Sequence, residues 1–123
     1  MITKFKYIYI KMSNNDILKL IQKMIDEHIE ENLKVDDIAT ELGMSRMQLH
    51  RRIKIITGKS LSGYILSVKM KKAEYLLLHT QYKVKDIALN IGYTDSSYFS
   101  KVFKKEKKHL PKAYRMKYSM YYQ

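Results

Sequence analysis

Two short segments of the sequence carry side chains that can bind the edges of nucleic-acid bases. Residues 46–51 include two arginines, a methionine and a histidine, and residues 96–101 include serines and a lysine. An arginine can donate two parallel hydrogen bonds to guanine O6 and N7, and a methionine can pack against a thymine methyl group. The candidates for base contact are Arg46, Met47, His50, Arg51, Ser96, Ser97 and Lys101. For each of them, a phosphate contact or simple solvation is the alternative.

A second set of residues around the same segments suits the phosphate backbone better than the bases. Lysine and arginine bind phosphates without specifying sequence. The free N–H groups at a helix start also attract anions. One serine and one threonine at expected helix starts are therefore further candidates for phosphate contact. The phosphate candidates are Ser45, Arg52, Lys54, Lys59, Thr94, Lys104, Lys105 and Lys112.

The charge distribution agrees with a polyanionic partner. The net charge of the 123 residues is +12. Residues 16–42 hold eight acids and three bases, whereas residues 43–123 hold eighteen bases and four acids. A basic stretch confined to one part of a chain is typical of nucleic-acid binding, although a solvated lysine-rich surface would show the same excess.

The basic segments lie in two copies of one pattern. Residues 34–43 (KVDDIATELG) and 83–92 (KVKDIALNIG) are identical at six positions at an offset of 49. After the glycine the offset becomes 50, and Leu49 then matches Phe99, Ile53 matches Phe103 and Tyr64 matches Tyr114. Such a repeat indicates a duplicated supersecondary unit whose second turn is one residue longer.

Each copy predicts a short helix, a turn and a second helix. Gly43 and Gly92 stand where the first helix ends and positive φ is needed. Ser45 is the expected N-cap of a helix at 46–57, and Asp95 or Thr94 of one at 96–107. An alanine in each first helix allows close crossing. Helix, glycine-containing turn and helix together form a helix-turn-helix unit.

Two further helices are expected around these units. Residues 61–79 contain no glycine after Gly63 and no proline, and place Leu66, Met70, Ala73 and Leu77 on one face, which predicts a long amphipathic linker helix. A stripe from Ile17 to His28 predicts a supporting helix before the first unit, with His28 in the core.

The expected organisation is one all-α domain of about seven helices, with two helix-turn-helix subdomains joined by the linker helix. The domain covers residues 13–118, with units at about 34–57 and 83–107. Residues 1–12 are expected to be a disordered or strand-like extension and residues 119–123 a tail.

Composition argues against several other classes of protein. The chain has no cysteine, which excludes disulfides and thiolate metal sites and favours a reducing, cytoplasmic location. No apolar run approaches the roughly 18 residues that cross a bilayer. The four histidines lack metal-ligand spacing, and neither a phosphate-binding loop nor a nucleophile elbow occurs. We expect no enzyme, no metal, no cofactor and no membrane partner.

The second copy resembles a known signature. Residues 92–105 (GYTDSSYFSKVFKK), followed by Pro111, Tyr114 and Arg115, are similar to the signature of the AraC/XylS regulators. The pattern across residues 64–77 resembles the linker helix of that family, and the likeness extends over about residues 17–117. The resemblance implies an all-helical domain with two helix-turn-helix units, and it points to the same base-reading faces.

The sequence departs from the family pattern at a few positions. Lys108 stands where glycine is usual, Leu110 where serine or threonine is usual, and Lys69 where arginine is common. Lys108 is therefore expected to adopt a left-handed backbone, which costs a residue other than glycine about 1–2 kcal/mol. The chain also lacks the separate sensing domain of most members, so we expect no small-molecule effector here.

The expected function is that of a bacterial, sequence-specific, double-stranded DNA-binding transcription regulator. Its two recognition helices would enter successive major grooves, about 34 Å apart, as a monomer or weak dimer associated with the nucleoid. The alternative is a degenerate module that acts through protein partners such as RNA polymerase. Retention of Arg46, Arg51 and Lys101 disfavours that alternative.

Overall fold

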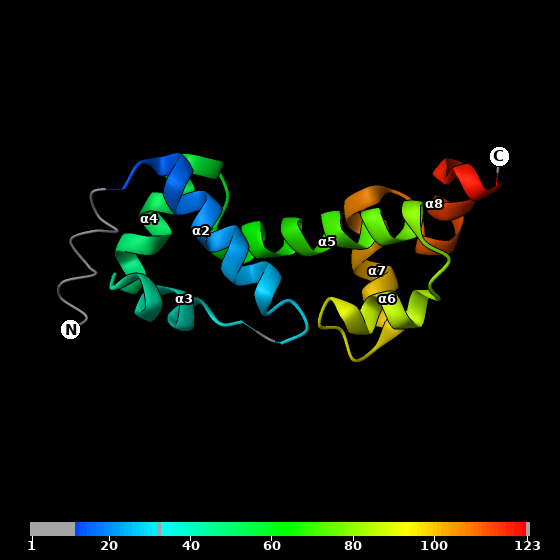
Figure 1. Ribbon diagram of the computed structural model, residues 1–123, viewed down its shortest axis with the longest axis horizontal. Helices are drawn as coiled ribbons and strands as arrows, with labels where there is room; N and C mark the ends of the chain where they lie inside the picture. Colours follow the sequence, from blue (N-terminus) through cyan, green and yellow to red (C-terminus); the bar gives the residue numbers. More distant parts are fainter. Residues whose placement is uncertain (1–11, 32, 123) are drawn as a thin grey trace. The chain divides into compact units, whose positions relative to one another are not determined.

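The computed structural model describes residues 12–31 and 33–122, and every regular element among them is helical (Figure 1). Of these residues, one compact unit takes 12–28 and 33–67, and a second takes 29–31 and 68–122. Seven α-helices and one 3₁₀ turn confirm the all-α class for the described residues. The extension expected at 1–12 lies, apart from Met12, outside them.

Unit 1 is built around isoleucine and leucine side chains from three helices. They are α2 (Asn14–Glu27), α3 (Val35–Leu42) and α4 (Arg46–Thr57). On these helices the side chains that are 1% exposed or less belong to Ile17, Ile21, Ile25, Ile38, Leu42, Leu49 and Ile53. Within each helix they recur at intervals of four residues, so each helix turns one apolar face to the common core.

The turn between α3 and α4 confirms the positive φ predicted for its glycine. Gly43 has φ 63°, and the Met44 N–H donates to the Ala39 carbonyl at 3.0 Å. Ala39 itself is buried. Its small side chain lets the two helices cross closely, whereas a larger one would separate them. Ser45 then caps α4: its hydroxyl accepts from the Gln48 N–H at 3.1 Å, and Gln48 Oε1 accepts from the Ser45 N–H at 2.9 Å.

Unit 2 repeats this arrangement with aromatic packing. It contains α6 (Val84–Asn90), α7 (Ser96–Lys107), α8 (Pro111–Tyr118) and the 3₁₀ turn η1 (Met120–Tyr122). Phe99 and Phe103 are fully buried, with ring centroids 5.9 Å apart. The Phe103 ring meets Tyr114 of α8 edge-on at 5.4 Å. These aromatic contacts join α7 to α8 within one core.

The second turn keeps the hydrogen bond of the first. The Tyr93 N–H donates to the Ala88 carbonyl at 2.9 Å, as Met44 does to Ala39. Gly92 has φ 94°, and a Cβ atom placed on it would lie 2.8 Å from the Ile29 carbonyl oxygen. Asp95, rather than Thr94, caps α7, because its carboxylate accepts from the N–H groups of Ser97 and Tyr98.

Helix α5 (Leu61–His79) contributes its first seven residues to unit 1 and the remainder to unit 2. Its bounds agree with those expected from the sequence. Met70, Ala73 and Leu77 are buried as predicted, but Leu66 is only half-buried. Val68 and Leu76 are buried in addition, because a helix that serves two units buries more than one stripe.

The last turn of α5 is closed by the C-terminal segment of the chain. Arg115 Nε donates to the Leu77 carbonyl at 3.1 Å, and Ser119 Oγ donates to the Leu78 carbonyl at 3.3 Å. The Tyr121 hydroxyl reaches the His79 carbonyl at 3.5 Å. Ser119 is fully buried, so the segment expected as a tail begins inside the fold. Carbonyls that a helix end leaves without partners are thereby satisfied.

The prediction that His28 lies in the core is wrong. The residue is exposed rather than in the core, and it serves as the C-cap of α2, with its backbone N–H directed at the Met24 and Ile25 carbonyls. Because α2 ends at Glu27, residue 28 leaves helical geometry, and the stripe no longer places its side chain inward.

Candidate nucleic-acid interface

Helix α4 divides its side chains between the core and solvent. Leu49 and Ile53 are fully buried. Arg46, Met47 and Arg51 are exposed and His50 is half-buried, so the four base-reading candidates of unit 1 stand on one helix and away from its core. Met47 is 68% exposed, so its side chain is accessible to a ligand.

Arg46 has a charged neighbour that no local pattern indicates. Its Nε atom lies 3.6 Å from Oδ1 of Asp36, at the start of α3. Ten residues separate the two in sequence, and the turn at Gly43 brings them together. Asp36 is therefore the residue near the candidate interface that the sequence analysis missed.

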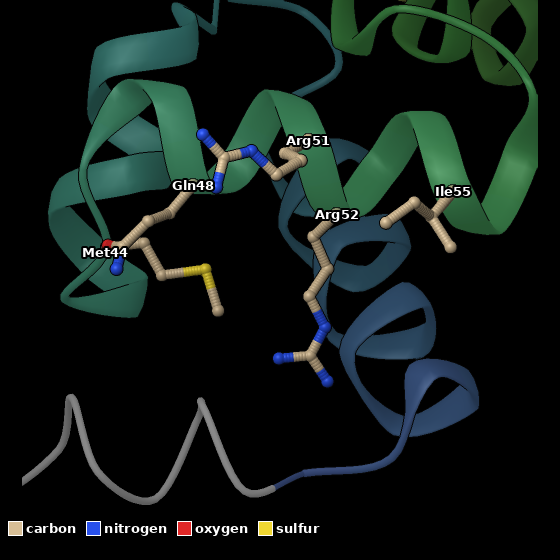
Figure 2. Close-up of a pocket in the computed structure, with 5 residues that line it drawn as sticks. All are labelled: Met44, Gln48, Arg51, Arg52 and Ile55. Carbon is tan, nitrogen blue, oxygen red and sulfur yellow. The ribbon is translucent and has the colours of Figure 1, made fainter.

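A groove of about 220 Å³ lies along one side of α4. Two arginines line it, and they differ in their contacts. Met44, Gln48, Arg51, Arg52 and Ile55 line it (Figure 2). Arg52 donates from Nε to the Asn14 side chain at 3.3 Å and from Nη2 to the Met12 carbonyl. It joins α4 to the start of α2, so these two donors are already engaged within unit 1.

Helix α7 presents a smaller and more polar face. Ser97 and Lys101 are exposed and Ser96 is half-buried, whereas Phe99 and Phe103 face the core. Tyr98 is 58% exposed and packs against Tyr93, with ring centroids 6.0 Å apart. The three base-reading candidates of unit 2 thus share one helix, as those of unit 1 do.

The phosphate candidates, Arg52 aside, are all exposed. Ser45 and Thr94 precede α4 and α7, Lys54 lies in the last turn of α4, and Lys59 follows that helix. Lys104 and Lys105 lie in the last turn of α7, and Lys112 lies on α8, which packs against α7. Each recognition helix is therefore flanked by cations of its own unit.

A polar network fixes α7 and α8 against α5 within unit 2. The Tyr114 hydroxyl donates to Glu74 Oε2 at 2.6 Å, and Lys107 Nζ lies 3.3 Å from the same oxygen. The hydrogen bond from Tyr114, together with Lys107, lowers the pKa of Glu74 despite partial burial. Burial, and then the hydrogen bond to Glu74, raises the pKa of Tyr114 to about 12.

Lys69 of α5 is packed beneath the second turn. Its Nζ lies 5.4 Å from the centre of the Tyr93 ring, within range of a cation–π interaction. Burial lowers the pKa of Lys69. The lysine that replaces the common arginine thus has an aromatic neighbour in unit 2, next to the turn that positions α7.

Comparison with known proteins identifies the family of this chain. A model described as a helix-turn-helix domain matches residues 38–117. The regulatory protein SoxS of Salmonella typhimurium is 34% identical over 104 residues, which cover 85% of this chain and 97% of SoxS. The chain belongs to the AraC-type helix-turn-helix family. It is a DNA-binding transcription regulator, as the resemblance implies.

Solved structures of AraC-type domains share the fold of this one. The C-terminal domain of AraT, a response regulator from Geobacillus stearothermophilus, superposes with a TM-score of 0.76 at 31% identity, covering 85% of this chain and 87% of that domain. The DNA-binding domain of AdpA, solved in complex with a target DNA, has a TM-score of 0.74 at 24% identity and covers 82% and 90%. The second likeness concerns the fold alone.

The described residues carry neither a membrane span nor a grouped metal site. No helix in residues 12–31 or 33–122 has the length and apolar character that a membrane span requires. Within the same ranges, no three histidine or acidic side chains are grouped so that they could hold a metal ion.

Proposed function

We propose that the chain reads an asymmetric operator with one recognition helix from each unit, α4 and α7, in successive major grooves of double-stranded DNA. The observation that carries this proposal is the repeated turn. The same N–H to alanine carbonyl hydrogen bond precedes both helices, and both turn a hydrophobic face inward and a polar face outward. The helix-turn-helix segments that do this are expected at about residues 34–57 and 83–107.

The roles of the side chains follow from their exposure. In unit 1, Arg46 and Arg51 offer guanidinium groups to guanine, Met47 offers an apolar contact to thymine, and His50 offers a ring nitrogen. In unit 2, Ser96, Ser97 and Lys101 take the corresponding positions. The phosphate set of Ser45, Arg52, Lys54, Lys59, Thr94, Lys104, Lys105 and Lys112 holds the domain in register.

Two units in one chain supply the two half-site contacts that many regulators obtain by dimerisation. We therefore propose binding as a monomer or weak dimer, to a site that need not be palindromic. We propose RNA polymerase as a second partner, because a regulator acts on transcription. We propose a regulator that acts in the cytoplasm at the nucleoid and has no catalytic activity of its own; its similarity to transcription regulators supports the regulatory role.

The test is selection from a random-sequence duplex library at two salt concentrations, followed by sequencing. The proposal predicts an enriched site with two boxes about one helical turn apart, roughly 34 Å. Binding that is independent of sequence and is lost with salt would contradict it, because counterion release alone behaves in that way.

Variants then assign each box to a unit. Arg51→Ala is expected to relax one box and Lys101→Ala the other, each at a cost of about 1–3 kcal/mol in discrimination. Lys54→Ala is the matched control, since loss of a phosphate contact leaves both boxes intact and lowers the salt slope by about 0.9. If Arg51→Ala and Lys101→Ala weakened all sequences equally, these residues would be phosphate contacts.

A further inference from the structure

The ion pair between Asp36 and Arg46 is a feature of the first recognition helix alone. Arg46 is the first residue of α4, where the helix dipole disfavours a cation. The side chains of Arg46 and Asp36 are 65% and 69% exposed, so the pair is accessible to a ligand. The offsets of the repeat place Lys85 and Ser96 at the corresponding positions of the second copy, where no such pair can form.

Asp36 is not needed to start its own helix. The residue that binds the N-terminal backbone of α3 is Asp37, whose Oδ2 accepts from the Lys34 N–H at 3.3 Å. The second copy keeps this aspartate as Asp86 but has lysine in place of Asp36. An aspartate thus occurs at this position in both copies, whereas the position of Asp36 is acidic in the first copy alone.

We propose that Asp36 is a specificity-determining residue, which restrains Arg46 and so lowers the affinity of unit 1 for arbitrary DNA. This inference rests on the proposed function. A phosphate that binds Arg46 must compete with the carboxylate 3.6 Å away. That phosphate also comes within the roughly 8 Å Debye length of Asp36, which repels it.

A guanine edge does not meet the same obstacle. Its O6 and N7 atoms are neutral acceptors, so Asp36 does not repel them as it repels a phosphate. The contact to Asp36 uses Nε, which leaves the two Nη groups of Arg46 to donate in parallel to guanine. Asp36 thus weakens the non-specific mode more than the specific one, and it acts as a positioning residue through Arg46.

The experiment compares dissociation constants for the selected operator and for a scrambled duplex of equal length, over a series of salt concentrations. Asp36→Asn is expected to strengthen binding to the scrambled duplex by about three- to tenfold and to steepen its salt slope by about 0.9, as one more cation becomes available to phosphate. Operator affinity is expected to change by less than about twofold, so the specificity ratio falls.

Three further variants separate this role from a general effect of charge. Glu41→Gln removes one negative charge from the last turn of the same helix and is expected to change the ratio much less. Asp36→Glu keeps the charge and is expected to retain the wild-type ratio. In an Arg46→Ala background, Asp36→Asn is expected to have no more effect than Glu41→Gln, because its action passes through Arg46.

The inference is overturned if Asp36→Asn strengthens binding to both duplexes equally, or if its effect persists in full without Arg46. A wild-type chain that fails to distinguish the operator from the scrambled duplex overturns the proposed function as well. A wild-type chain that distinguishes them, with Asp36→Asn unchanged in ratio and slope, overturns the role of Asp36 alone. Thermal unfolding of each variant, compared with that of the wild type, checks that a change in binding does not come from loss of the fold.

Discussion

The two helix-turn-helix copies share a backbone and differ in what surrounds it. In unit 1 the turn lies among isoleucine and leucine side chains, and α4 ends at a glycine in the left-handed region, Gly58 with φ 73°. In unit 2 the corresponding helix packs through phenylalanine and tyrosine rings and ends at Lys108 with φ 71°.

This comparison separates what the motif requires from what each copy has acquired. The turn hydrogen bond, the buried alanine and the N-cap occur in both copies. The polar network of Glu74, Tyr114 and Lys107 belongs to unit 2, and the pair of Asp36 and Arg46 belongs to unit 1. Unit 1 therefore has a distinctive ion pair on its exposed face, and unit 2 has a distinctive polar network between its helices.

The largest expected difference concerns the two left-handed glycines Gly92 and Gly58. Gly92→Ala is expected to lower the free energy of unfolding by about 3 kcal/mol, because the strain of positive φ adds to a clash with a carbonyl oxygen. Gly58→Ala is expected to cost about 1–2 kcal/mol, since only the strain remains. A Cβ atom at Gly58 would meet nothing within 4 Å. Urea denaturation followed by circular dichroism measures both, and equal losses would show that the Ile29 carbonyl moves aside freely.

Two matched tyrosines provide the second comparison. Tyr114→Phe is expected to destabilise the chain by about 1–2 kcal/mol, because it removes a hydrogen bond to a charged acceptor. Tyr64→Phe, at the corresponding position of the first copy, is expected to change stability by less than about 0.5 kcal/mol. Among the described residues, the Tyr64 hydroxyl has no hydrogen bond. The same denaturation experiment checks the pair, and a larger loss for Tyr64 would reverse the argument.

The pH dependence of stability sharpens this difference. Glu74 has a lowered pKa in the folded state, so its contribution is present above the ordinary value of 4.5 and is lost as pH falls through the folded value. Tyr114 has a pKa raised to about 12, so stability is lost as pH rises from 10 towards 12. Tyr114→Phe should flatten both limbs in a series of denaturation curves. Limbs as steep as those of the wild type would mean that other groups dominate.

The smallest expected effects come from exchanging the helix ends of the two copies. Lys108→Gly is expected to stabilise the chain by about 0.5–1 kcal/mol, because it relieves left-handed strain that exceeds the entropy gained by the unfolded glycine. Gly58→Lys is expected to destabilise it by about 1 kcal/mol for the same reason. Thermal melts of the two variants should move in opposite directions, and a shift of the same sign would indicate that side-chain contacts outweigh backbone strain.

Local chemistry explains which features the sequence predicts. The caps Ser45 and Asp95, the glycine Gly43 and the left-handed Lys108 depend on residues within a few positions of themselves, so they can be recognised without a fold. The bounds of α4, α5 and α7 follow from the same signals. Because these bounds are predicted correctly, the base-reading candidates are placed correctly on α4 and α7. Their individual roles stay predictions.

The features that the sequence does not predict depend on distant pairs. Arg115 and Leu77 are 38 residues apart, and Tyr114 and Glu74 are 40 residues apart. Nothing in the neighbourhood of Arg115 marks it as a buried cation. The prediction for His28 fails for a related reason. The end of α2 decides where that side chain points, and the spacing of the apolar residues does not.

The closed end of α5 has a consequence for how the chain is made. Within the part of the chain that the structure describes, the carbonyls of Leu77, Leu78 and His79 accept side-chain hydrogen bonds from Arg115, Ser119 and Tyr121. While a ribosome extends the chain, water must occupy those carbonyls until residues 115–121 have left the exit tunnel. All the helices of unit 1 have by then been synthesised, so the first copy can fold before the second has the residues that close α5.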